Sequence, residues 1–264
     1  MRSNGRIFGV KNSTDVTSAS GIWNLSKVHL ERTTDKWVGD AYLVDFFIAG
    51  GGGRGGNEWG GGGGGGGTQT ITSQEITPGT SLSVIVGGAG SPSSFNSVTA
   101  SAGSNGGNSG GTGGTSGNGY AGRAGRPSSY RGSRGGGSTA SGSDGGTGEY
   151  NSYTGTAIGY CGGGTGGAGS GQNPDESATG YGAGQGNRDF NANSVQMTGT
   201  ANSGGGGGGG GGGNSSGGSG GSGVVVIRYP ESLPAVNAVT GSPEITVSGG
   251  YRIYKFNASG TITF

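Results

Sequence analysis

Hydrophobic residues gather in short stretches near the two ends of the chain, and two of these stretches are nearly continuous. Residues 41–49 read AYLVDFFIA, and residues 224–229 read VVVIRY. Short apolar runs that are rich in β-branched and aromatic residues and bounded by glycine or proline are typical of buried β-strands. We therefore expect one strand on each side of the long glycine-rich middle of the chain.

A second pattern, strict alternation of hydrophobic and polar residues, follows the first glycine run. It spans residues 68–86, TQTITSQEITPGTSLSVIV, and indicates strands with one buried face. The Pro78-Gly79 pair in its middle suits the central positions of a type II turn. The pattern predicts a β-hairpin whose buried residues are Ile71, Ile76, Leu82, Val84 and Val86.

The C-terminal tail alternates in the same way over EITVSGGYRIYKFNASGTITF, residues 244–264. Gly249 and Gly250 lie between two alternating stretches, where a hairpin turn requires positive φ angles. The tail therefore predicts further antiparallel strands, with buried positions at Ile245, Val247, Tyr251, Ile253, Phe256, Ile262 and Phe264.

The N-terminal segment, residues 1–40, has an ordinary composition and one pattern with helical spacing. Ser18 or Ser20 can cap a short helix that carries Ile22, Leu25, Val28 and His29 on one side. A segment this short does not fold alone. We expect it to dock on another protein through its hydrophobic side chains, chiefly Trp23, Leu25 and Trp37.

Composition changes the picture for the middle of the chain. Glycine accounts for 74 of 264 residues, whereas only 27% are hydrophobic and 11% are charged. An ordinary side-chain core along the whole chain is therefore impossible. One alternative is a flexible linker. Runs such as residues 204–213, ten glycines without a serine spacer, favour order instead.

Polyglycine II offers an ordered structure for such runs. In this conformation the chain has three residues per turn and makes no internal hydrogen bonds, so its amides point outward. Where the side chains are hydrogen atoms, neighbouring segments approach until their backbone groups bond to one another. We expect the glycine runs at residues 60–67 and 204–213 in the interior of a polyglycine II bundle, and the mixed stretch at residues 103–119 at its periphery.

Most catalytic chemistry has no support in the sequence. None of the lysines follows a glycine, which excludes a phosphate-binding P-loop. His29 and Cys161 lie in unlike regions, and the acidic stretch SDGGTGEY lacks the repetition of calcium-binding repeats. Scattered carboxylates favour a glycan-degrading enzyme only faintly. We expect no enzyme, no cofactor and no metal, and the net charge of +1 predicts no nucleic-acid partner.

The sequence favours binding of another molecule over catalysis. Three islands within the glycine-rich region, at residues 120–134, 149–161 and 172–190, concentrate tyrosine and arginine. These residue types are enriched in binding surfaces. Turns between packed glycine segments would bring the islands together at a tip, although the same side chains could also cover the bundle or contact sister subunits. The candidate receptor-binding residues are Tyr120, Arg123, Arg126, Tyr130, Arg131, Arg134, Tyr150, Tyr153, Tyr160, Tyr181, Arg188 and Phe190.

The order of these motifs resembles the glycine-rich domains of bacteriophage and marine-virus proteins. The resemblance rests on AYLVDFFIAGGGG, the ITPGTSLSVIV strand and turn, SSFNSVTASAG, and the closing GGGGNSSGGSGGSGVVVIRYP, and it covers roughly residues 41–264. The T-even-like tail-fibre adhesins are more distantly similar. In those adhesins, polyglycine II helices carry variable receptor-binding loops. The N-terminal segment, however, has no close match to their fibre-attachment domain.

The resemblance implies a virion protein with three parts. These are an attachment segment (residues 1–40), a glycine-rich domain (residues 41–230) and a C-terminal β segment (residues 231–264). The expected fold is mainly β, with antiparallel elements at both ends of a polyglycine II bundle and a short N-terminal helix. The implied function is a tail-fibre or tail-tip adhesin that binds a protein or polysaccharide on the host surface. A head fibre, capsid decoration or spacer is the alternative. Other virion proteins are the implied partners, and fibre proteins are often homotrimers.

Overall fold

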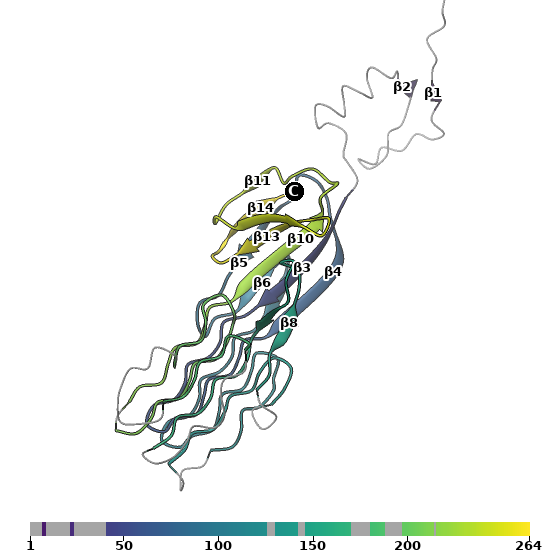
Figure 1. Ribbon diagram of the computed structural model, residues 1–264. Helices are drawn as coiled ribbons and strands as arrows, with labels where there is room; N and C mark the ends of the chain where they lie inside the picture. The colour runs from purple at the N-terminus through teal and green to yellow at the C-terminus, as the bar shows by residue number, and fades with distance from the viewer. Residues whose placement is uncertain are drawn as a thin grey trace, which may run out of the picture.

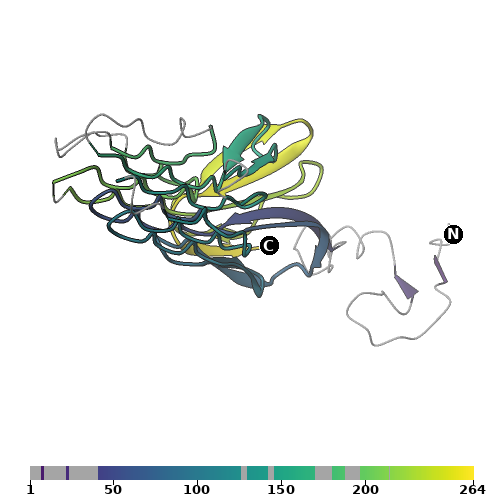
Figure 2. The same ribbon diagram turned by 90° about the horizontal axis from the view of Figure 1, so that it is seen from below.

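The computed structural model describes residues 7–8, 22–23, 41–125, 130–141, 146–169, 180–187, 197–213 and 215–264. The described residues from 41 onward form a β-sheet region, which we call the base, and an elongated glycine-rich region, which we call the body (Figure 1). The body consists of chain segments that run side by side away from the base and return to it (Figure 2). The C-terminus lies in the base.

Two antiparallel sheets build the base. The first sheet contains the apolar strands on either side of the body and two strands from the tail, so it joins distant parts of the sequence. The second also combines early strands with tail strands. In spatial order the first sheet is β12 (Glu244–Ser248), β13 (Tyr251–Phe256), β10 (Val224–Pro230), β3 (Tyr42–Ala49) and β4 (Thr68–Ile76). The second is β11 (Ala238–Val239), β14 (Gly260–Thr263), β5 (Ser81–Ile85), β6 (Ser93–Phe95) and β7 (Val98–Ala100).

The main hydrophobic core joins residues of both sheets. Phe46 of β3 meets Phe95 of β6 edge to face, with 5.0 Å between ring centroids. Tyr42 packs in the same way against Phe264, at 5.1 Å. Both sheets therefore contribute aromatic side chains to one core, and β10 and β13 add Val225, Ile227, Tyr229, Tyr254 and Phe256.

The opposite face of the first sheet is partly covered by a β-hairpin. Its strands are β8 (Glu149–Asn151) and β9 (Ile158–Tyr160). Tyr160 packs on Phe47 of β3, with 4.8 Å between ring centroids. Tyr153, in the hairpin loop, belongs to the same buried cluster. Alternate residues of β3 thus face two different cores, which is why its sequence is apolar at almost every position.

The predicted hairpin over residues 68–86 is wrong in its pairing. β4 pairs with β3 in the first sheet, whereas β5 pairs with β14 and β6 in the second. The turn itself is as expected, because Gly79 has a φ of 83° and Thr80 N donates to the Thr77 carbonyl. Alternation identified which residues face a core, but the turn carries the chain from one sheet to the other.

The predicted N-terminal helix is wrong at Ile22. Ile22–Trp23 is strand β2, which pairs with β1 (Ile7–Phe8). The rest of the predicted helix lies outside the described residues, as do Leu25 and Trp37. The mainly β, antiparallel architecture is confirmed, and the part of the chain that the structure describes contains no helix of the length and apolarity needed to span a membrane.

Backbone hydrogen bonds with a period of three residues connect the segments of the body. The amides of Gly50, Gly53 and Gly56 donate to the carbonyls of Gly67, Gly64 and Gly61 in the returning segment. The intervening residues bond elsewhere, since Gly52 and Gly55 donate to Gly221 and Gly218. Each segment therefore bonds to neighbours on several sides. The distances, 2.7 to 2.9 Å, are those of ordinary backbone hydrogen bonds.

The two long glycine runs lie inside this body, as predicted. Residues 60–67 and 204–212 are buried, and only Gly213 at the end of the second run is exposed. A methyl group at each position from Gly205 to Gly209 would overlap a backbone carbonyl oxygen of another segment. Glycine is therefore required there by close approach. Residues 103–119 lie at the periphery, where most of their polar side chains are exposed.

Asparagine side chains extend the backbone hydrogen bonding at the periphery. The amides of Arg54 and Asn57 donate to the Oδ1 atoms of Asn105 and Asn108, at 2.9 and 2.8 Å. Near the base, the Thr68 amide donates to Asn118 Oδ1 at 3.1 Å. A side-chain oxygen here takes the place of a neighbouring carbonyl, so the outer segment is held in a defined alignment.

Candidate binding surface

The body has two ends with different surroundings. One end continues into the strands of the base. At the other end, which we call the tip, each segment reverses direction. The first reversal, Asn57–Glu58–Trp59, is midway between the end of β3 at Ala49 and the start of β4 at Thr68. The tip is therefore the part of this out-and-back segment that lies farthest along the chain from the base.

Backbone hydrogen bonds join several turns at the tip. The amides of Glu58 and Trp59 donate to the carbonyls of Ser215 and Gly211. The Ser109 amide donates to the Asn57 carbonyl, and its hydroxyl donates to Glu58 Oε2 at 3.3 Å. Turns that are distant in sequence thus form one connected surface.

An aromatic pair stands on this surface. The rings of Trp59 and Tyr130 meet edge to face, with 4.9 Å between centroids and 71° between planes. Tyr130 remains 58% exposed. Gly169 lies against the Trp59 ring and the Tyr130 Cβ atom, and its amide donates to the Tyr130 carbonyl. The two rings are therefore fixed relative to each other, and the Tyr130 ring remains accessible to solvent.

Both aromatic residues have left-handed backbone conformations. The φ angles are 52° for Trp59 and 52° for Tyr130, and the neighbouring turns add 50° for Glu58 and 51° for Ser109. A non-glycine residue in this region costs roughly 1–2 kcal/mol. Glycine would avoid that cost, and it is abundant in the rest of the chain, but it does not occur at these positions. The side chains at these positions must therefore offset the strain through packing or function.

The other predicted receptor-binding residues are spread over the molecule. The exposed ones include Tyr120, two residues after Asn118 at the base end of the body, and Tyr150 in β8. Arg123, Arg131 and Tyr181 are half-buried. The structure therefore does not bring the three islands together at one tip. Arg126, Arg188 and Phe190 lie outside the described residues.

Three predicted surface residues are in fact buried. Tyr153 and Tyr160 are 8% and 2% exposed and pack between the hairpin and the first sheet, and Arg134 is 6% exposed within the body. Their side chains fill space between segments, so they are not available to a receptor. The sequence pattern could not separate them from the exposed tyrosines, because all of them lie among glycine and serine.

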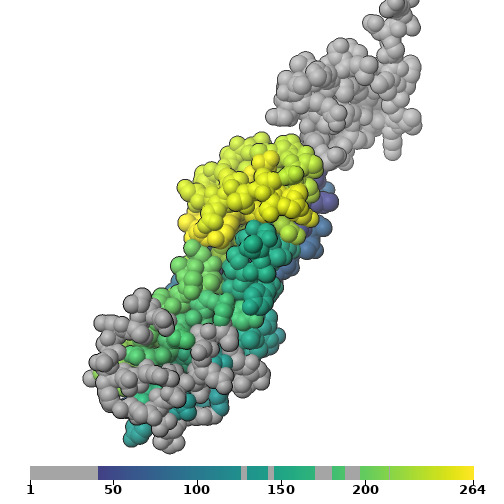
Figure 3. Space-filling model, in the orientation of Figure 1, coloured from purple at the N-terminus to yellow at the C-terminus, as the bar shows by residue number. Residues whose placement is uncertain are grey.

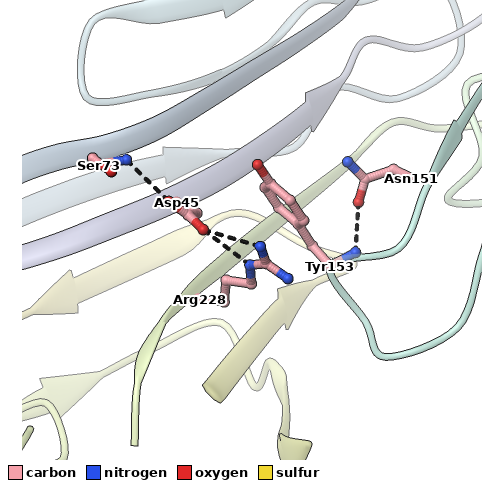
Figure 4. A network of polar contacts seen from close by, with 5 residues as sticks. All are labelled: Asp45, Ser73, Asn151, Tyr153 and Arg228. Carbon is pink, nitrogen blue, oxygen red and sulfur yellow. Dashed lines mark hydrogen bonds and ion pairs between the residues drawn. The ribbon is translucent and has the colours of Figure 1, made fainter. Parts of the chain in front are cut away.

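Tyr153 instead takes part in a polar network on the base (Figure 4). Its ring lies 3.8 Å from the Arg228 guanidinium carbon, and the guanidinium donates twice to Asp45 Oδ2, at 3.0 and 3.2 Å. Asp45 Oδ1 accepts the Ser73 amide at 2.9 Å. Burial is the main cause that raises the pKa of Tyr153, and the Asp45 carboxylate adds to it while Arg228 opposes it. The network fastens the hairpin loop to the first sheet.

Trp59 was not among the residues predicted for binding. The available signal was its position, because the sequence NEW separates the glycine-rich stretch at residues 50–56 from the glycine run at residues 60–67. An isolated large aromatic residue between stretches without side chains has no hydrophobic neighbours in sequence. Its presence there indicates a specific use.

A model of the glycine-rich domain family matches residues 32–230 of the chain. The chain belongs to this family. In this member, the matched region runs through β3, the whole body and β10, whereas strands β11 to β14 follow it in sequence and complete both sheets of the base. Comparisons with curated proteins and with solved structures gave no match.

The described part of this glycine-rich domain protein contains no group of three or more histidine, cysteine, aspartate or glutamate residues that could hold a metal ion. Cys161 is fully buried at the start of a glycine segment, and burial raises the pKa of its thiol well above the usual range. A thiol in this state is not a nucleophile.

Proposed function

We propose that the protein is a bacteriophage virion protein, a tail-fibre or tail-tip adhesin that binds a receptor on the host-cell surface through its tip. The observation that carries the proposal is the Trp59–Tyr130 pair on strained backbone at the far end of the body. Large, rigid aromatic side chains are the usual anchors of binding surfaces. The base would face the particle, and the body would serve as a spacer.

The sequence supports this function independently. The ordered succession of strand, glycine block, T-P-G-T turn and closing V-V-V-I-R-Y-P strand resembles viral glycine-rich domains. Residues 1–40, with Trp23, Leu25 and Trp37, would attach the protein to other virion components. A homotrimer would agree with the common state of fibre proteins. The binding function requires neither a cofactor nor nucleic acid.

We also infer that the body adopts polyglycine II geometry. The three-residue period of its hydrogen bonds agrees with three residues per turn, and the neighbours on several sides agree with amides that point outward all round. Polyglycine II requires φ near −75°. Three-bond couplings and backbone chemical shifts of residues 205–209, measured by NMR, should give that angle. Values scattered over several regions would contradict the inference.

The binding function can be tested with adsorption of the virus that encodes the chain. Preincubating host cells with the purified full-length protein should block adsorption. Tyr130→Ala should weaken this competition about tenfold or more, since loss of an interface anchor typically costs 1–2 kcal/mol or more. Tyr120→Ala is the matched control, because Tyr120 is an exposed tyrosine at the opposite end of the body.

The contrary outcome would favour the structural alternative. If the wild-type protein does not compete and an antibody label on intact particles lies on the head, the protein is a head fibre, capsid decoration or spacer. If competition occurs but both tyrosine variants compete as well as the wild type, the tip is not the binding surface.

A further inference from the structure

A groove lies beside the base, where three parts of the chain meet. The β8–β9 hairpin, the turn at residues 200–203 and the strands β12 and β13 line a hollow of about 390 Å³. A second hollow of about 150 Å³ shares Ile158, Glu244 and Lys255 with the first and continues it along β12. Figure 3 shows these teal, green and yellow parts meeting on one face of the molecule. This volume is in the range of small-molecule binding sites.

The wall of the groove formed by the tail strands carries fixed polar groups. Glu244 accepts hydrogen bonds from Lys255 Nζ at 3.3 Å and from Asn257 Nδ2 at 2.6 Å. Asn257 therefore uses its amide nitrogen internally, and its Oδ1 atom is buried without a hydrogen-bond partner among the described residues. The carboxylate and the ammonium group neutralise each other, and the Glu244 side chain, which is 58% exposed, remains accessible as an acceptor.

Hydroxyl groups and backbone line the rest of the groove. Thr200 contributes a hydroxyl group from the turn, and Thr154, Thr156 and Thr246 line the smaller hollow. The described hairpin sheet contains only β8 and β9, so the outer edge of β9 has no strand partner in it. Apolar atoms form about as much of the lining as polar atoms do, and they include those of Ile158, Tyr160 and Ala201.

An aromatic pair flanks the groove. Tyr150 and Tyr181 lie 4.8 Å apart between ring centroids, and Tyr150 is 62% exposed. Gly159, which lines the groove, is the cross-strand partner of Tyr150, and a side chain at that position would collide with the Tyr181 ring. The absence of a side chain at Gly159 therefore lets the tyrosine ring lie close over the hairpin, next to the polar wall.

We propose that this groove binds a neutral oligosaccharide. Sugar hydroxyls both donate and accept hydrogen bonds, which matches a wall of hydroxyl, amide and carboxylate groups, and the apolar face of a sugar ring suits the tyrosine pair. An acidic ligand would require an excess of cations, whereas Lys255 is already paired with Glu244. The site is independent of the tip.

The experiment uses the full-length protein and a panel of neutral disaccharides to tetrasaccharides built from hexose and N-acetylhexosamine units, with uronic-acid oligosaccharides for comparison. Saturation-transfer NMR identifies binders, and calorimetry measures their affinity. Tyr181→Ala should weaken binding about fivefold through loss of the aromatic contact. Glu244→Ala should weaken it about tenfold through loss of charged hydrogen bonds.

Tyr120→Ala, an exposed tyrosine that does not line the groove, should bind like the wild type. Unchanged thermal unfolding of all three variants shows that their folds are intact. The proposal is overturned if no neutral sugar binds at millimolar concentration, if only the acidic sugars bind, or if binding is insensitive to both groove substitutions. Loss of sugar binding in Tyr130→Ala alone would place the ligand at the tip and also overturn it.

Discussion

The base and the body are built from the same chain but are held together by different forces. In the base, aromatic and branched side chains such as Phe46 and Ile227 are removed from water. In the body, the buried residues are mainly glycines, and the contacts between segments are backbone hydrogen bonds. The comparison shows that a protein interior needs close packing and satisfied polar groups, and that large side chains are one way to achieve this.

The base and the body differ in the free-energy terms that stabilise them. Side chains in the base supply hydrophobic free energy, at roughly 25 cal/mol for each Å² buried. The body lacks most of that term and must also order glycine, which loses more conformational entropy than any other residue. Each backbone hydrogen bond contributes only about 0.5–1.5 kcal/mol net. The body therefore depends on many such bonds forming together, and local damage should spread.

The substitution Gly206→Ala gives the largest expected effect. A methyl group there would overlap the Gly63 carbonyl oxygen, and the segments must separate to accommodate it. We expect a loss of at least about 4 kcal/mol, in the range reserved for severe core defects. Gly88→Ala is the matched control, since its methyl group would meet nothing within 4 Å. Thermal unfolding and amide hydrogen exchange measure both.

If Gly206→Ala unfolds at the same temperature as Gly88→Ala, the segments of the body can move apart to accommodate a methyl group at little cost in stability. Close packing of the segments would then not explain why glycine occupies this position. If the amides of residues 204–212 lose their protection from hydrogen exchange while the base stays protected, the body and the base unfold separately.

Alkaline pH should act on the base, with a smaller effect. Burial raises the pKa of Tyr160 to about 12, with smaller contributions from Cys161 and Glu244, whereas a tyrosine in the unfolded chain has a pKa near 10. The unfolded state therefore loses its proton first. This contribution to stability is complete below pH 10 and is lost as the pH rises from 10 through 12. The glycine runs have no titratable side chain.

Urea unfolding of the wild type and of Tyr160→Phe between pH 8 and 12 measures this contribution. The phenylalanine variant keeps the ring and removes the titrating group, so its stability should fall less steeply above pH 10. Equal slopes for the two proteins would mean that Tyr160 is ionised as easily in the folded state as in the unfolded one.

The sequence was most informative where side chains alternate. Strands β3, β10, β12 and β13 were predicted close to their observed bounds, and Gly249 and Gly250 have the positive φ angles, 59° and 81°, that their turn requires. Alternation identified the buried face of most strands, but it was wrong for β12, an edge strand on which Ile245 and Val247 are 51% and 54% exposed. It also does not report which strand lies next to which. The pairing of β4 and β5 was therefore wrong.

For the body and the candidate site, the sequence was less informative. It placed residues 204–213 in the interior, because a run without side chains can be packed on all sides, and all of them except Gly213 are buried. It could not say which segment lies beside which, since identical residues carry no pairing preference. The same limit applies to the tyrosines, and Tyr130 and Tyr160 differ only in their surroundings in three dimensions.

The three-residue period also limits how the segments can slide. A slip by one residue would break every contact between two neighbours, whereas a slip by three residues, about 9 Å in polyglycine II, would restore all of them with new partners. Glycine alone cannot reject that state. The strands of the base make it unfavourable, because they fix the segments that enter the body at one end. Asn105 and Asn108 are three residues apart, so one of their two hydrogen bonds would survive the slip, and they add only a smaller preference for the observed alignment.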